Sequence, residues 1–148
     1  MKKFEFSLSH MRDYKERLLD EEKGALQRVK SERDAIEDDI RRLDSEFAQL
    51  SLELVKAQMK GTTIVELRKY SAQLDNVRLQ QEERKKALAK AEQRVEKQMK
   101  VVIAANQEVS KLDKLQERQY EEYRHQVTKA EEDRIDEFVA QTLCRVAV

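Results

Sequence analysis

The sequence lacks most of the residues that end helices or fill a thick globular core. Its 148 residues include no Pro, two Gly and no Trp, and aromatic residues make up only 5%. A globular domain of this length normally contains more turn residues and more aromatic side chains. We therefore predict a single elongated domain over residues 1–148, held together by a narrow apolar seam.

Cysteine and long apolar runs are also scarce. Cys144 is the only cysteine, which excludes an internal disulfide and favours a reducing cytosol. The longest apolar run, Val101 to Ala105, is far shorter than the ~20 residues that a membrane-spanning helix needs. The first residues, Met1 to Phe6, lack the apolar stretch of a signal peptide. We predict a cytoplasmic protein without direct membrane insertion.

Charge and motifs give no sign of an enzyme or a cofactor site. The 30 basic and 30 acidic residues cancel, so no whole-chain attraction to nucleic acid or anionic lipid is expected. Neither Gly24 nor Gly61 lies in a Gly-rich phosphate-binding loop. His10 and His125 could bind a metal together with carboxylates, but a solvated histidine on a charged helix is far more common. We predict no catalytic residue, no metal and no cofactor.

The sequence does contain a heptad repeat that breaks once. A strict period of seven winds helices into a left-handed coiled coil, so the pattern predicts an all-α fold of two long helices in an antiparallel hairpin. It also argues against disorder, which a charged fraction of 41% could otherwise indicate. The main row before the break is Val29, Ile36, Leu43, Leu50 and Ala57, and after it Leu67, Leu74, Gln81, Leu88, Val95, Val102, Val109, Gln116, Tyr123 and Ala130.

The break lies between Lys60 and Thr63 and has the chemistry of a turn between helices. Gly61 can adopt the left-handed conformation that follows a helix end. Thr63 and Glu66 have the spacing of a capping box, in which Glu66 reaches back to the start of the second helix. We predict helix 1 over about 7–60, starting at Ser7 or Ser9, a turn over 61–63, and helix 2 over about 64–143. Connections this short join antiparallel neighbours.

The predicted helices are unequal in length. Folding at Gly61 places residue i opposite roughly residue 124 − i, so that Phe4 faces Tyr120 and residues beyond about Tyr120 overhang without a partner in helix 1. The overhang is apolar, which is typical of an interaction surface; self-association or fraying is the alternative. Its apolar residues are Tyr120, Tyr123, Val127, Ile135, Phe138, Val139 and Leu143.

Several residues interrupt the seam. Arg33 and Arg84 lie on a second row beside the main one, and we expect each to extend outward and pair with a nearby acid. This second row is Leu19, Leu26, Arg33, Ile40, Phe47 and Leu54 before the break, and Tyr70, Val77, Arg84, Ala91, Gln98, Ala105 and Leu112 after it. Gln81, Gln98 and Gln116 are expected to loosen the seam. Gly24 within helix 1 is either a tolerated surface glycine or a point where a partner's backbone approaches closely.

Three patches, in their order and spacing, resemble the FliJ family of bacterial flagellar export proteins. They are Phe4-x-Phe6-x-Leu8; Gly61-x-x-x-Val65-Glu66-Leu67-Arg68-x-Tyr70-x-x-x-Leu74; and Leu112-x-x-Leu115-x-Glu117-Arg118-x-x-Glu121-x-Tyr123 followed by Glu131-x-x-x-Ile135-Asp136-Glu137. The resemblance implies a non-enzymatic, stalk-like coiled coil of the flagellar type III export apparatus, peripheral at the cytoplasmic face of the inner membrane. It implies that the end with both termini enters the hexameric export ATPase, that the chain contacts the membrane-embedded export gate, and that it hands over export chaperones.

The resemblance also implies two sets of binding residues. The export-gate set lies in the half near the turn and comprises Leu43, Leu50, Gln73 and Val77. The ATPase-binding set lies at the other end and comprises Phe4, Leu8, Met11, Leu112, Leu115, Tyr120, Tyr123, Val127, Ile135 and Phe138.

Two alternative functions stay open at this point. One is the equivalent stalk of a virulence type III secretion system, which sequence separates poorly from a flagellar one. The other, from a different class, is a helical arm that binds nucleic acid, which needs a basic stripe. Its candidate residues are Arg68, Lys69, Arg78, Arg84, Lys85, Lys86, Lys90, Arg94 and Lys97.

Overall fold

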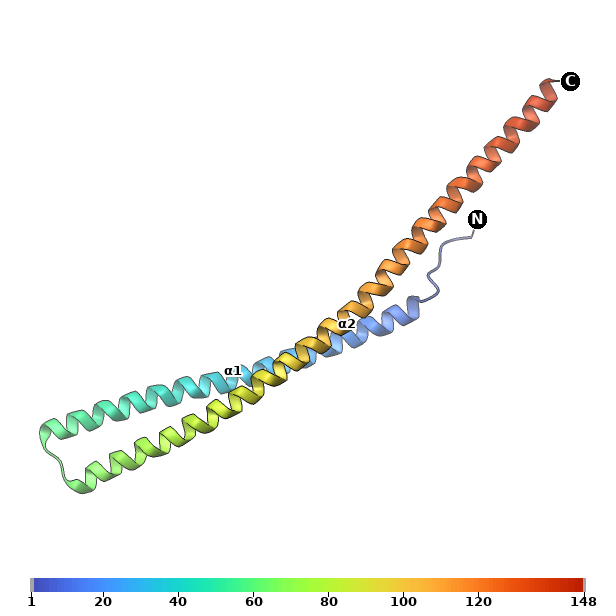
Figure 1. Ribbon diagram of the computed structural model, residues 1–148. Helices are drawn as coiled ribbons and strands as arrows, with labels where there is room; N and C mark the ends of the chain where they lie inside the picture. The colour runs from blue at the N-terminus through green and yellow to red at the C-terminus, as the bar shows by residue number, and fades with distance from the viewer. Residues whose placement is uncertain (1, 148) are drawn as a thin grey trace. The chain divides into compact units, whose positions relative to one another are not determined.

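The computed structural model describes residues 2–147, which form two α-helices and no strand. Helix α1 (Ser9–Lys60) and helix α2 (Ile64–Val146) run antiparallel and are joined by three residues at Gly61 (Figure 1). The predicted two-helix hairpin with a longer second helix is therefore confirmed. The helix bounds differ from the predicted ones by two or three residues, at the start of α1 and the end of α2.

The chain divides into two compact units, each made of parts of both helices. The turn unit comprises Glu21–Ile103 and contains the connection between the helices. The terminal unit comprises Met1–Asp20 and Ala104–Val148 and contains both ends of the chain.

The connection between the helices is a glycine turn followed by a side-chain cap. Gly61 has a φ of 83°, the left-handed conformation that the sequence predicts, and its N–H donates to the Gln58 carbonyl at 3.3 Å. Thr63 caps α2, because its hydroxyl accepts the Glu66 N–H at 3.3 Å. The Glu66 carboxylate does not complete the expected capping box; it accepts a hydrogen bond from the Thr62 hydroxyl at 2.5 Å.

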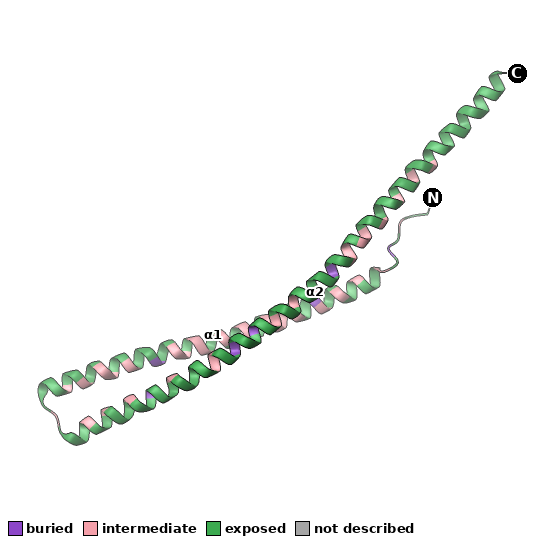
Figure 2. Cartoon of the chain, viewed as in Figure 1, coloured by how far each residue is buried: buried purple, intermediate pink, exposed green. Residues whose placement is uncertain are grey.

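The core of each unit is a thin seam on the predicted heptad rows, which Phe6 extends in the segment before α1. The buried residues of the turn unit are Leu43, Val77, Ala91 and Val95, and those of the terminal unit are Phe6, Leu19 and Val109. No polar or charged residue among those described is buried. Figure 2 shows the buried positions as isolated points along helices whose remaining surface is partly or fully exposed. The seam therefore supplies apolar contact along one narrow face of each helix.

Cross-helix contacts confirm the predicted register. In the turn unit, the Gln81 amide donates to Asp44 at 2.8 Å and the Arg78 guanidinium lies 5.3 Å from the centre of the Phe47 ring. In the terminal unit, Phe4 lies against Tyr120 with ring centres 5.3 Å apart. All three pairs agree with residue i facing roughly residue 124 − i.

Polar residues on the seam rows find partners. Arg84 pairs across the helices with Asp39 at 3.7 Å, and Arg33 pairs with its neighbour Asp34 at 3.1 Å, as expected. Gln98 donates from its amide to two oxygens of Glu22, the backbone carbonyl at 3.1 Å and the side chain. Such a bond forms only when the helices are correctly aligned, so it specifies register.

The two glycines predict opposite responses to alanine. A Cβ at Gly24 would meet nothing within 4 Å, so Gly24→Ala should raise the free energy of unfolding by about 1 kcal/mol through helix propensity. Gly61→Ala should lower it by about 1 kcal/mol, because alanine is strained at a positive φ. Urea unfolding followed by circular dichroism measures both. A destabilising Gly24→Ala would indicate a close backbone approach from outside the chain.

Candidate partner-binding surfaces

The amino-terminal segment before α1 packs along α2 in the terminal unit. Phe6 is buried, and the Phe4 ring lies 5.3 Å from the Tyr120 ring and 5.5 Å from the Tyr123 ring, measured between ring centres. The Tyr123 hydroxyl donates to the Lys2 carbonyl at 2.6 Å. The prediction that α2 has no partner beyond about Tyr120 is therefore wrong by roughly one turn, because a non-helical segment extends the pairing.

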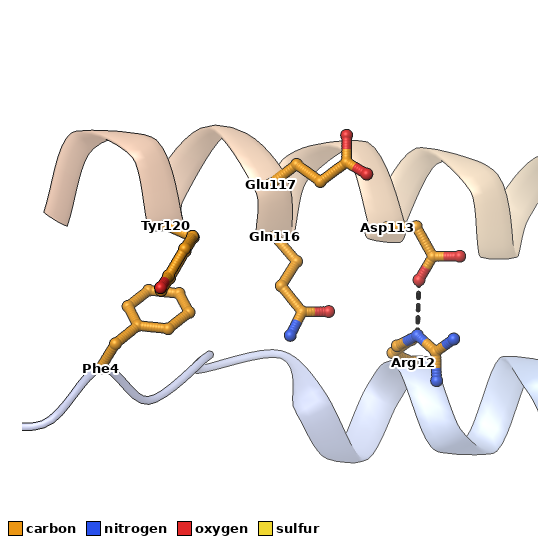
Figure 3. Close-up of a pocket in the computed structure, with 6 residues that line it drawn as sticks. All are labelled: Phe4, Arg12, Asp113, Gln116, Glu117 and Tyr120. Carbon is orange, nitrogen blue, oxygen red and sulfur yellow. Dashed lines mark hydrogen bonds and ion pairs between the residues drawn. The ribbon is translucent and has the colours of Figure 1, made fainter. Parts of the chain in front are cut away.

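An open groove of about 490 Å³ lies between this segment, the first turn of α1 and α2. Figure 3 shows the Phe4 and Tyr120 rings at one end, the Arg12–Asp113 pair at the other, and Glu117 pointing outward from α2. Both ends can contact a partner, one through aromatic faces and the other through charge. The groove is open along its length, so it suits side chains of another protein better than an enclosed small ligand.

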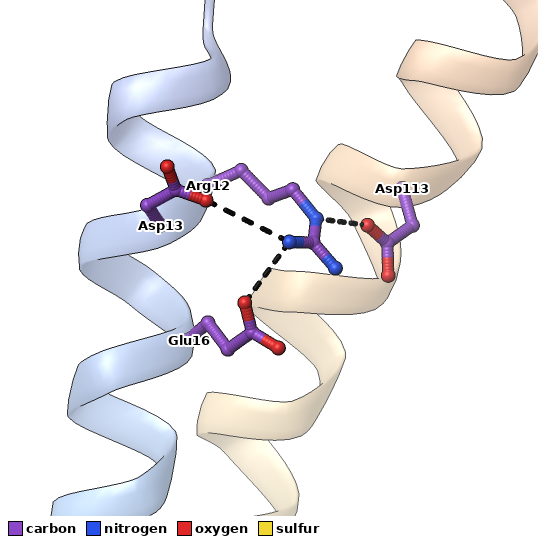
Figure 4. Close-up of polar contacts among 4 residues, drawn as sticks. All are labelled: Arg12, Asp13, Glu16 and Asp113. Carbon is purple, nitrogen blue, oxygen red and sulfur yellow. Dashed lines mark hydrogen bonds and ion pairs between the residues drawn. The ribbon is translucent and has the colours of Figure 1, made fainter.

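Arg12 joins the two helices at the mouth of this groove. Its Nε donates to Asp113 of α2 at 2.5 Å, and its Nη1 donates to Glu16 at 2.9 Å (Figure 4). The hydrogen bond to Asp113, then the charges of Asp113 and Glu16, raise the pKa of the Arg12 guanidinium above its ordinary value. The side chain therefore stays cationic in any usual buffer, and the pair fixes α1 against α2 beside the amino-terminal segment.

Beyond the paired region, α2 presents a separate apolar surface. Val127 and Ala130 are half-buried, whereas every residue from Glu131 to Ala147 is exposed. At 100° per residue, the apolar side chains of this segment are centred about 150° around the helix from Ala130. The predicted overhang therefore comprises two different faces. We call the exposed face the terminal stripe; it consists of Ile135, Phe138, Val139, Leu143 and Val146.

The predicted ATPase-binding residues fall into two groups. Ile135 and Phe138 belong to the terminal stripe, and 70% of Phe138 is exposed. Met11 and Tyr120 are also exposed, beside the groove or on the first turns of α1. The remaining residues are half-buried within the terminal unit and hold it together: Phe4, Leu8, Leu112, Leu115, Tyr123 and Val127.

The predicted gate-binding residues differ in how much surface they offer. Leu43 and Val77 are each only 4% exposed, and Leu50 is half-buried, because all three lie on seam rows. Gln73 is exposed and lines an open, mainly polar groove with Glu53, Glu66, Lys69 and Tyr70. Of the four, Gln73 is the residue whose side chain is available to a partner without disturbing the seam.

A further apolar surface near the turn was missed from the sequence. Residues Ala48, Leu52, Val55 and Met59, here called the turn stripe, are exposed on α1, with Met59 at 83%. Their spacing of four, three and four residues is a second heptad row, centred about 150° from the Leu43 and Leu50 row. The last turns of α1 are thus apolar on two opposite faces. The heptad spacing of the turn stripe is visible in the sequence, but these residues lie off the rows that define the hairpin.

Two classes of site find no support in the described residues. Among residues 2–147, no cluster of three or more His, Cys, Asp or Glu side chains is arranged to hold a metal ion. In the same residues, neither helix has a stretch long and apolar enough to cross a lipid bilayer.

Comparison with known proteins gives one family. The family described as "Flagellar FliJ protein" matches residues 4–147, which include both helices, the turn and most of the amino-terminal segment. No curated protein and no solved structure matches the chain.

The Arg12–Asp113 contact predicts a local effect on order. Arg12→Gln should speed amide hydrogen exchange in residues 2–12, because this part of the chain loses one of its links to α2. Arg41→Gln is the control, since Arg41 forms only exposed pairs within α1. Hydrogen exchange read by mass spectrometry measures both variants. Equal exchange of the segment in Arg12→Gln and in the unmodified chain would contradict this role.

Proposed function

The chain belongs to the family of flagellar FliJ proteins, and from that membership we propose that it is a non-enzymatic stalk of the flagellar protein export apparatus. In this proposal the terminal unit binds the hexameric export ATPase and the turn unit contacts the membrane export gate. The family match supports a role in flagellar export, and the assignment of partners to the two units is our inference from their surfaces.

The terminal stripe is the main support for ATPase binding. Ile135, Phe138 and Leu143 each leave more than half of the side chain exposed on a helix that has no neighbour there among the described residues. Covering such a row contributes about 25 cal/mol per Å² of apolar surface. An amphipathic helix with this spacing binds by laying its apolar face into a groove of another protein. The ATPase is the partner that the family implies for this end.

The groove beside Phe4 supplies a second contact on the same unit. Its position is fixed by the buried Phe6, the Tyr123–Lys2 hydrogen bond and the Arg12 pair. A partner that binds the terminal stripe and also reaches this groove would recognise both ends of the chain together. Met11 and Tyr120 are the exposed apolar residues available for that second contact.

Gate binding in this proposal uses Gln73 and the polar groove around it. Leu43 and Val77 act indirectly, because they are buried in the seam that holds α1 against α2. Export-chaperone handover, and a peripheral location at the cytoplasmic face of the inner membrane, complete the proposal and rest on family membership.

The alternative functions have less support. The family match is to flagellar proteins, which favours flagellar over virulence export. Among the basic residues needed for a nucleic-acid arm, Arg84 and Arg94 are paired with acids across the helices, and Arg78 lies over Phe47. Partial neutralisation of that stripe weakens any attraction to phosphates.

Substitution within the terminal stripe should weaken ATPase binding. Ile135→Gln together with Phe138→Gln should raise the Kd for the purified hexameric export ATPase by at least about tenfold, since central apolar residues dominate such interfaces. Biolayer interferometry measures the affinity, and circular dichroism should show unchanged helicity.

Leu79→Gln is the matched control for that experiment. Leu79 is 61% exposed and lies in the turn unit, so its substitution removes exposed apolar surface elsewhere, about half as much as the double substitution does. An unchanged Kd for the stripe variant would exclude the terminal stripe as the ATPase contact. An equal loss for both variants would indicate a general effect of surface polarity.

The predicted gate residues should separate into binding and stability effects. Gln73→Ala should weaken binding to the cytoplasmic part of the gate protein without changing the unfolding free energy, because the side chain is exposed. Leu43→Ala should lower the unfolding free energy by about 2–3 kcal/mol through loss of seam packing. Pull-down and urea unfolding give the two readouts. Normal gate binding by Gln73→Ala would place the contact elsewhere.

A further inference from the structure

The turn stripe and the terminal stripe match each other in length and pattern. The turn stripe runs from Ala48 to Met59 on α1, and the terminal stripe from Ile135 to Val146 on α2. Each spans eleven residue steps, or about 16 Å of helix. Each repeats apolar side chains every three or four residues, which is the spacing at which one helix packs along another.

The charges beside the two stripes are opposite. Lys56 and Lys60 flank the turn stripe near its Met59 end. At 100° per residue, three acidic residues lie beside the first residues of the terminal stripe: Glu131, Glu132 and Asp136. None of these lysines or acids forms an ion pair in the described part of the chain, where the ion pairs involve other residues. Each stripe therefore leaves charge available for a partner of the other sign.

These charges favour one direction of pairing. In an antiparallel contact, Ile135 lies opposite Met59 and Val146 lies opposite Ala48, so the acidic end of the terminal stripe meets Lys56 and Lys60. In a parallel contact the same acids would lie near Asp44, which repels them. Nearby Arg41 and Arg42 would not offset this, because they already pair with acids on α1.

We propose that the terminal stripe of one copy docks antiparallel on the turn stripe of a second copy. Mixing two variants that each lack one stripe distinguishes docking between copies from docking within one chain. The contact is heterologous, since the two copies use different surfaces, and it can therefore close into a pair or extend into a short chain.

The contact is small, and its size decides what it does. Two helical stripes of this length bury less than the roughly 1,200 Å² of a stable protein interface, so the association is weak and reversible. It covers the terminal stripe when no larger partner is present. A partner with a deeper groove displaces the second copy. The inference goes beyond the proposed function and is tested with no other protein present.

Two variants that complement each other provide the test. The turn variant carries Leu52→Gln and Met59→Gln, and the terminal variant carries Phe138→Gln and Val139→Gln. Sedimentation velocity over roughly 10 µM to 1 mM, where small interfaces dissociate, should show the unmodified chain associating with rising concentration. Each variant alone should remain monomeric. An equal mixture should form a dimer, because one variant keeps the turn stripe and the other keeps the terminal stripe.

Other results overturn the proposal in distinguishable ways. An unmodified chain that stays monomeric throughout excludes the contact. Association of the terminal variant alone indicates that two turn stripes pair with each other, and association of the turn variant alone indicates pairing of two terminal stripes. A monomeric mixture also contradicts it. Leu79→Gln should associate like the unmodified chain, and the turn variant should still bind the ATPase, so failure here is separate from failure of the proposed function.

The lysines test the direction of pairing. Lys56→Gln with Lys60→Gln should weaken self-association severalfold and reduce its dependence on salt, because the variant loses two charges that meet the acidic end. Lys85→Gln with Lys86→Gln is the control, since these lysines are exposed in the turn unit away from the turn stripe. Equal salt dependence in both variants would exclude the antiparallel arrangement.

Discussion

The narrow apolar seam between two antiparallel helices is the constraint from which the rest of this structure follows. Each helix can bury only the rows that face the other, and the buried positions, such as Leu43 opposite the region of Val77, are single residues at heptad intervals. Any apolar side chain off those rows must stay in water or meet another protein. The exposure of Met59 and Phe138 is thus a geometric consequence of a fold with one seam, and no repacking within the hairpin could cover them.

A seam of small apolar layers holds helices together but aligns them weakly, since a slip by one heptad replaces one layer with a similar one. The polar contacts supply the alignment. Gln98 can reach both oxygens of Glu22, and Gln81 can reach Asp44, in one register only. Arg12 and Asp113 do the same in the terminal unit. The residues that weaken the seam thermodynamically are therefore the ones that place each remaining surface at a defined position.

Periodicity and turn chemistry were sufficient to predict the hairpin, the Gly61 turn and the pairing of Phe4 with Tyr120, because these depend on rows that recur many times. Features that occur once were not predictable in the same way. The Tyr123–Lys2 hydrogen bond depends on a non-helical segment, which has no periodic pattern. The Glu66 carboxylate had two nearby donors available, the Thr62 hydroxyl and the backbone N–H of the expected capping box, and it accepts from Thr62. The turn stripe lies off the rows that define the hairpin, so the periodicity of the seam did not predict it. The terminal stripe was predicted as a continuation of the seam. Its apolar side chains move to a different face of α2 within a short segment after Ala130, which the heptad pattern does not reveal.

A stalk that joins two partners needs an exposed binding surface in each unit, and exposed apolar rows promote association with any available surface. Zero net charge offers no general repulsion between copies to oppose this. If another surface permanently covered these apolar rows, they could not bind the intended partner. If nothing covered them, they would associate with other proteins indiscriminately. A contact between two short stripes lies between these limits, because it reduces exposure yet is too small to compete with a full-sized interface. The modest length of the two stripes is therefore compatible with covering between free copies and with release to a larger groove.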